Sequence, residues 1–231
     1  MTFVCMICLV FFSCTKTINQ PEQVVIQVSP ASMTPYDESR IMRLPGNYQG
    51  WNVATAPRVV SPNGNGEFEG YVNFSNPQSQ FYLVKGTAWD NVTTYNQTGP
   101  ASFGFNGDFF FVREGAGVYK VNVNMNTHLW SCTKIMSWGL RGSACSVSTD
   151  AVMSFDQATM SWSVTKNLVK GDVVFRANES EDLVLGHNIE SAPGIPDYKG
   201  EKIGISETGK YTVVLSLASA GNYRYSITKI N

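Results

Sequence analysis

Turn signals divide this chain into segments that are too short for helices of ordinary length. Clusters of Gly, Pro, Asn and Asp, which favour tight turns, recur along most of the sequence. They occur at PNGNG (62–66), Asn76-Pro77, Gly99-Pro100, Asn106-Gly107, GAG (115–117), Lys170-Gly171-Asp172 and Gly221-Asn222. The runs between them alternate polar and apolar residues or are rich in aromatic residues, and none has helical periodicity. This spacing predicts an all-β chain that forms β-sandwiches.

An internal repeat indicates how many sandwiches the chain contains. The segment GVYKVNVNMNTHLWSCTKI, which ends at Ile135, is similar to GKYTVVLSLASAGNYRYSITKI, which ends about 95 residues later at Ile230. Further matches are LPGN (44–47) with LRGS (140–143) and LVKG (83–86) with VFRA (174–177). We therefore expect two tandem modules, over residues 39–135 and 136–231.

The N-terminus has the pattern of an exported lipoprotein. The apolar run TFVCMICLVFF is shorter than the roughly 18 residues that span a bilayer, and it fits the apolar part of a signal peptide. The following FFSCTK resembles the lipobox of bacterial lipoproteins, in which the cysteine, here Cys14, is acylated. We expect a signal peptide over residues 1–13 and a lipidated N-terminus and tether over residues 14–38, which would anchor the protein to a membrane. The alternative is a buried N-terminal strand in which the cysteine occurs by chance.

Charge and cysteine content exclude several classes of function. With 17 basic and 18 acidic residues, the chain has no basic excess that would indicate nucleic-acid binding. Beyond the N-terminal segment only Cys132 and Cys145 remain, either as a disulfide or as two buried thiols. His128 and His187 are far from both cysteines, so no metal-ligand spacing is present and we expect neither a metal nor a cofactor.

Two tryptophans lie in polar turns rather than in strand-like runs. Trp51 lies in GNYQGWNVATAP, and Trp89 lies in KGTAWDN. An exposed tryptophan forgoes burial unless a ligand covers it, and the apolar C–H face of a sugar ring can stack on an indole. We therefore expect the two rings to form a glycan site, whereas the alternatives are packing of Trp51 on its own loop and capping of the sandwich by Trp89. The other tryptophans lie in strand-like runs and are expected in the core: Trp130, Trp138 and Trp162.

Several segments of the chain resemble one known family. The segments RIMRLPGNYQGWNVATAPRVVSPNGNGEFEGYVNF, WGLRGSA and WSVTKNLVKGDVVFRAN are similar to the SusE and SusF family of starch-binding outer-membrane lipoproteins. The resemblance extends over about 190 residues and includes both modules and the lipoprotein start. It implies tandem, non-catalytic carbohydrate-binding modules on the cell surface, with starch or another α-glucan as ligand and an outer-membrane glycan transporter as a partner.

The same resemblance implies roles for individual residues of the first module. Trp51 and Trp89 would stack on consecutive glucose units, and Lys85 would form hydrogen bonds with sugar hydroxyls. Polar residues near these positions in the sequence are expected at the rim of the site: Asp90, Asn91 and Asn47.

The second module lacks the two stacking residues. The segment SACSVSTD (143–150) contains no aromatic residue, and Ser180 occupies the position of Trp89. Only the basic position is kept, as Arg176, so we expect this module not to bind at the equivalent site.

Two alternatives to glycan binding remain. A glycoside hydrolase needs two carboxylates at a defined separation, and no motif selects a pair among the scattered acidic residues Asp90, Asp108, Glu114 and Asp172. The other alternative is an envelope lipoprotein with a structural or accessory role and no ligand.

Overall fold

The computed structural model describes residues 36–146, 149–191 and 193–230. The expected signal peptide, Cys14 and nearly all of the expected tether lie outside the described residues. The described chain is nearly all β-structure in sandwich-like sheets, which confirms the all-β prediction. Two 3-10 helices, η1 (Glu38–Arg40) and η2 (Ser143–Cys145), are short turns, and no helix among these residues has the length and apolar character needed to cross a bilayer.

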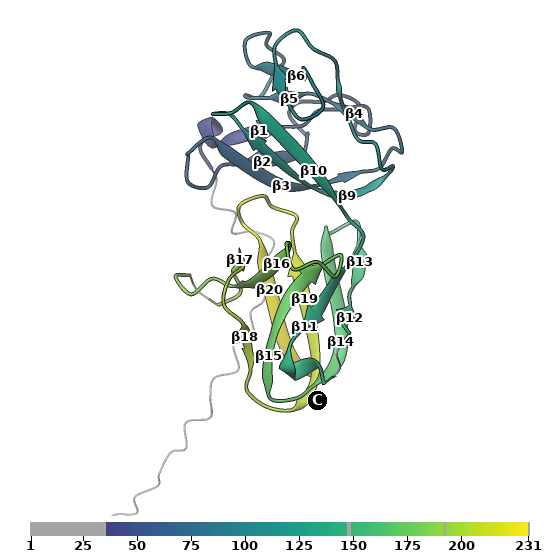
Figure 1. Ribbon diagram of the computed structural model, residues 1–231, viewed down its shortest axis with the longest axis vertical. Coiled ribbons are helices and arrows are strands. Elements are labelled where there is room, and N and C mark those ends of the chain that lie inside the picture. The colour runs from purple at the N-terminus through teal and green to yellow at the C-terminus, as the bar shows by residue number, and fades with distance from the viewer. Residues whose placement is uncertain (1–35, 147–148, 192, 231) are drawn as a thin grey trace, which may run out of the picture.

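The N-terminal part of the described chain forms one sandwich (Figure 1). Its strands are β1 (Ile41–Arg43), β2 (Arg58–Val60), β3 (Glu67–Phe74), β4 (Gln80–Phe81), β5 (Leu83–Val84), β6 (Thr94–Gln97), β7 (Phe103–Gly104), β8 (Phe110–Phe111), β9 (Gly117–Asn124) and β10 (Leu129–Ile135). Eight of them form a sheet in the order β10-β9-β3-β2-β1-β5-β6-β7, while β4 pairs with β8. Fully buried Phe74, Phe81 and Phe110 stack in succession in the core. The strands are short because turn residues interrupt them, as the spacing of Gly, Pro and Asn predicts.

The C-terminal part also forms a sandwich, but its strands are divided differently between the sheets. Its strands are β11 (Trp138–Arg141), β12 (Ala151–Val152), β13 (Ser154–Asp156), β14 (Ser161–Leu168), β15 (Gly171–Ala177), β16 (Val184–His187), β17 (Pro196–Tyr198), β18 (Ile203–Ile205), β19 (Gly209–Ser216) and β20 (Arg224–Ile230). One sheet has the order β12-β11-β15-β16-β17, with β18 also paired to β15, and the other has the order β13-β14-β19-β20. Their facing apolar side chains form the core.

The long hairpins β9–β10 and β19–β20 are the structural counterpart of the sequence repeat. The hydroxyl of Tyr119 donates to the carbonyl of Gly115 at 2.7 Å, and that of Tyr211 donates to the carbonyl of Glu207 at 2.8 Å. Each tyrosine therefore ties the start of its long strand to the turn four residues earlier.

The tryptophans of the strand-like runs lie where the strand pattern predicts, whereas the cysteines do so only in part. Trp130 belongs to the first core, and Trp138 and Trp162 belong to the second, which confirms the prediction for these three residues. Cys132 and Cys145 are free thiols rather than a disulfide: Cys132 is half-buried in β10, and Cys145 is buried in the 3-10 helix η2 rather than in a strand. Burial raises the pKa of the Cys132 thiol to about 11.

The two modules are joined by a packed interface. Tyr71 of β3 belongs to the same buried cluster as Trp138 of β11, and its ring contacts that of Tyr223, which lies just before β20. The side-chain amide of Asn178 accepts hydrogen bonds from the backbone of Met136 and Ser137 and donates to that of Lys134. The connection between β10 and β11 is therefore held against the second module.

A buried arginine near the start of the first module gives a prediction about pH. The Arg43 side chain is 2% exposed and forms two hydrogen bonds with Glu38, which hold the pKa of that carboxyl below its ordinary value of 4.5. Because a lowered pKa stabilises the folded state only while the carboxyl is ionised, this stabilisation is complete above pH 4.5 and is lost as the pH falls through the lowered value.

We expect Glu38→Gln to destabilise the protein at pH 7 by about 1 kcal/mol, a small value because the carboxylate is largely exposed to solvent. The difference in melting temperature between the variant and the parent should shrink toward zero as the pH falls below 4.5, because the parent carboxyl becomes neutral too. Thermal melts from pH 7 to pH 3 would check this. A difference that is the same at both ends of that range would contradict it.

Candidate functional site

Four aromatic side chains form an open depression of about 580 Å³ on the first module. Trp51 lies in the loop between β1 and β2, Tyr82 between β4 and β5, Trp89 in the loop between β5 and β6, and Phe109 just before β8. We call these four residues the aromatic platform. Tyr82 is its central member, because its ring centroid lies 5.8 Å from that of Trp51, 5.8 Å from that of Trp89 and 4.8 Å from that of Phe109.

The rings of the aromatic platform are set at angles to one another. The ring of Tyr82 makes an angle of 89° with that of Trp89, 48° with that of Trp51 and 39° with that of Phe109. Trp89 is 47% exposed and Phe109 is 40% exposed. These two rings are therefore accessible to a ligand from solvent. Because of their mutual angles, the four rings do not lie in one plane.

The backbone at Trp51 is unusual and well supported. Trp51 has a φ of 62°, directly after Gly50 at 75°. A bulky residue in the left-handed region is strained, and such strain is concentrated at functional positions. The Trp51 N–H donates to the carbonyl of Gly46, while Gln49 and Asn52 form two reciprocal hydrogen bonds around the same turn. These hydrogen bonds fix the backbone of the turn, while the indole itself contacts the rings of Tyr82 and Phe109.

The residues predicted from the sequence are only partly brought together. Trp51 and Trp89 contact the same ring, that of Tyr82, so both belong to one depression. Lys85, at the end of β5, does not line the depression. Asp90 accepts a hydrogen bond from the N–H of Val92 through its side chain, so it helps to form the turn that carries Trp89.

The two predicted asparagines differ in their surroundings. Asn91 is exposed in the same turn as Asp90. Asn47 uses both ends of its side-chain amide in the protein: it donates to the carbonyl of Gln78 at 3.0 Å and accepts from the N–H of Gln80 at 3.0 Å. Its amide therefore holds the loop before Trp51 against β4.

Sequence reasoning missed Tyr82 and Phe109. Each alternates with a fully buried phenylalanine, Phe81 in QFYLV and Phe110 in GDFFFV, so each must point away from the core. A large aromatic residue at the outward position of an alternating run is the signal that would have found them. Tyr82 and Phe109 are not tryptophans and lie outside the two turns from which the site was predicted.

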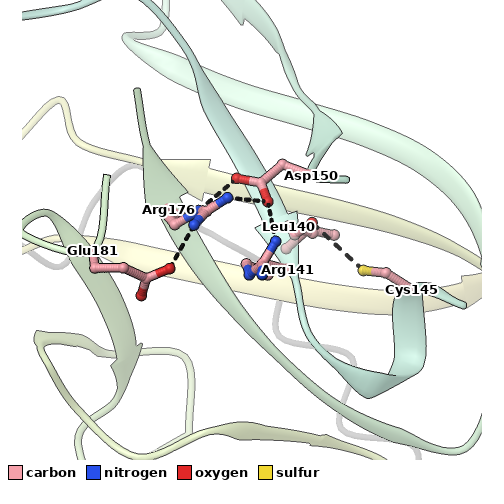
Figure 2. A network of polar contacts seen from close by, with 6 residues as sticks. All are labelled: Leu140, Arg141, Cys145, Asp150, Arg176 and Glu181. Atoms are coloured by element: carbon pink, nitrogen blue, oxygen red, sulfur yellow. Dashed lines mark hydrogen bonds and ion pairs between the residues drawn. The ribbon is translucent and has the colours of Figure 1, made fainter. Parts of the chain in front are cut away.

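The basic position of the second module has a structural role. Arg176 is 9% exposed, and its guanidinium forms two hydrogen bonds with Asp150, both at 2.8 Å, and one with Glu181 at 2.5 Å (Figure 2). The hydrogen bonds to Asp150 are the main cause that raises the pKa of Arg176 above its ordinary value, and the bond to Glu181 adds to it. The guanidinium is therefore occupied by carboxylates of its own module.

The described residues contain no group of three or more His, Cys, Asp or Glu side chains that could hold a metal ion. Comparison with known proteins gives no assignment either. No protein-family model matches the chain, and a search of curated proteins found none that is significantly similar. The assignment of function therefore rests on the aromatic platform and on the sequence.

Proposed function

We propose that this protein is a non-catalytic glycan-binding lipoprotein of the cell surface, and that it binds starch or another α-glucan on the aromatic platform of its first module. The observation that carries the proposal is the depression lined by Trp51, Tyr82, Trp89 and Phe109, with Trp51 held in a strained backbone conformation. The sequence resemblance to starch-binding lipoproteins supports the same ligand class.

Stacking explains why aromatic rings suit this ligand. One face of a pyranose ring carries C–H groups and packs on an aromatic face, and rigid rings provide contact area at little cost in conformational entropy. A ribbon-like β-linked glucan needs coplanar rings, whereas the rings at 48° and 89° to Tyr82 complement the curvature of a helical α-glucan.

The expected affinity is modest. Two stacked sugars and a few exposed hydrogen bonds, offset by the ordering of ligand and loops, leave about −4 to −7 kcal/mol, or a Kd between roughly 1 mM and 10 μM. Such affinity suits a surface that captures a polymer through many repeated sites.

The proposed location follows from the N-terminal sequence. An acylated Cys14 would anchor the protein to the outer membrane, where a glycan transporter is the expected partner, and the second module would act as a spacer. Detergent phase separation of the protein taken from cells tests the anchor, because an unacylated chain would remain in the aqueous phase.

Affinity electrophoresis tests the binding proposal. The protein without its lipid, residues 15–231, is run through gels that contain amylopectin, xylan, levan or mannan, and we expect retardation by amylopectin. The double variant Trp51→Ala/Trp89→Ala of the same fragment should run unretarded, which also tests whether the second module contributes. Migration of the parent unchanged in every gel would favour the alternative, an accessory lipoprotein without a ligand.

A further inference from the structure

The four aromatic rings by themselves do not provide the hydrogen bonds that the hydroxyls of a bound sugar need. All four residues that line the depression are aromatic, whereas each sugar hydroxyl that leaves water needs a polar partner in exchange. The depression is lined by the four rings alone, and the amide of Asn47 is already bonded to the protein at both ends. The hydrogen bonds must therefore come from side chains that flank the depression on the same face.

Strand register identifies the first of these side chains. The relevant antiparallel pairs are Phe81↔Phe110, Leu83↔Tyr95 and Gln97↔Asp108. One residue further along these antiparallel strands, Tyr82 lies opposite Phe109 and opposite Asn96, and Asn96 lies opposite Phe109. Because opposite residues on antiparallel strands point to the same face, Asn96 shares the outward face of the two platform rings. A Cβ placed on Gly107 would lie 3.2 Å from the Cβ of Asn96, which agrees with this register.

The alternation along β4 identifies the second. Gln80 precedes Tyr82 by two residues and pairs with Phe111, which follows Phe109 by two residues. Residues two apart on a strand point to the same face, so Gln80 lies on the platform face at the opposite end from Asn96.

Both amides are available to a ligand. Gln80 and Asn96 are half-buried, and neither side chain is hydrogen-bonded to another residue of the described chain. The strand neighbour of Asn96 on its other side is Gly104, which has no side chain to cover the amide. Asn47 fixes the backbone of Gln80. The side chain of Asn47 accepts a hydrogen bond from the N–H of Gln80, and the backbone N–H of Asn47 donates to the carbonyl of Gln80.

We propose that Gln80 and Asn96 provide the hydrogen bonds of the glycan site, one at each end of the Tyr82–Phe109 pair. This inference rests on the proposed function. A carboxamide carries two donors and an acceptor, so it binds two adjacent sugar hydroxyls at once. The aromatic platform would then supply contact area, while the two amides select the orientation of the hydroxyls.

Calorimetry with two probes tests this inference. Maltoheptaose presents free hydroxyls, whereas per-O-methylated maltoheptaose keeps the ring faces but cannot donate hydrogen bonds. We expect the parent to prefer maltoheptaose, and we expect Asn96→Ala and Gln80→Ala each to weaken binding of maltoheptaose by about three- to tenfold. Binding of the methylated probe should change much less, so the preference of each variant should shrink.

A matched control and a stability measurement complete the test. Gln157→Ala removes an exposed amide from a turn of the second module and should leave both affinities unchanged. The melting temperatures of all variants are measured, since both substitutions are on strands. Equal weakening for both probes would show a distorted platform and overturn the inference, as would parental affinities in both variants. Failure of the parent to bind maltoheptaose would instead overturn the proposed α-glucan function, and the inference with it.

Discussion

Replacing Trp89 with alanine is expected to weaken glucan binding by about 30- to 150-fold, which removes detectable binding from an already modest site. The indole is 47% exposed and stands at 89° to the ring of Tyr82, so it forms one wall of the depression. Its removal deletes a whole stacking surface. Because about half of the side chain is in solvent, the free energy of unfolding should change by only about 0.5–1 kcal/mol.

Phe105→Ala is the matched control for this experiment. Phe105 is 49% exposed, stacks on Tyr95 of β6 and does not line the depression. Calorimetry with maltoheptaose should give the parental Kd for this variant. Parental binding by Trp89→Ala, or an equal loss in Phe105→Ala, would show that the aromatic platform is not the binding site.

Replacing Asp150 with asparagine is expected to destabilise the second module by about 3–5 kcal/mol. The Asp150 side chain is 2% exposed and makes two hydrogen bonds with the buried Arg176, and it lies 3.6 Å from Arg141 (Figure 2). The substitution leaves the guanidinium of Arg176 in a poorly solvated position, where, of its two carboxylate partners in the described chain, Glu181 is the one that still forms a hydrogen bond with it. Urea unfolding should show a lower midpoint without a change in slope.

Glu207→Gln gives a comparison within the same module. Glu207 pairs with Lys229 at 2.7 Å, but its side chain is 62% exposed, so the pair should contribute less than about 1 kcal/mol. A loss of stability in Asp150→Asn no larger than that in Glu207→Gln would contradict a structural role for the Arg176 network.

Much of the fold could be predicted because its causes are local. Turn residues such as Asn106-Gly107 interrupt the chain wherever a strand would otherwise continue, and period-two alternation separates buried Phe81 and Phe110 from outward neighbours. The burial of Trp130, Trp138 and Trp162 follows from the same patterns. These signals act over a few residues, so they can be read without knowing which strands pair.

The candidate site was predictable only in part. The sequence placed Trp51 and Trp89 in polar turns, but it did not show that both would contact Tyr82. For Trp51 that contact requires the segment before it to pair with the strands that flank Tyr82, as in Arg43↔Val84 and Gly46↔Phe81, and a single sequence does not specify such pairings between distant segments. The same limit applies to Phe109, which lies at the site because β8, the strand that follows it, pairs with β4.

The sequence by itself determined the all-β class, the repeated hairpins and the aromatic character of the first module, because alternation and turn chemistry act locally. Only the tertiary structure decided which polar residues are available to a ligand. Asn47 is occupied by the backbone of Gln78 and Gln80, and Arg176 is occupied by Asp150, although both read from the sequence as free polar groups. A hydrogen-bonding side chain is free or engaged according to the strand that packs beside it, and that neighbour comes from a distant part of the chain.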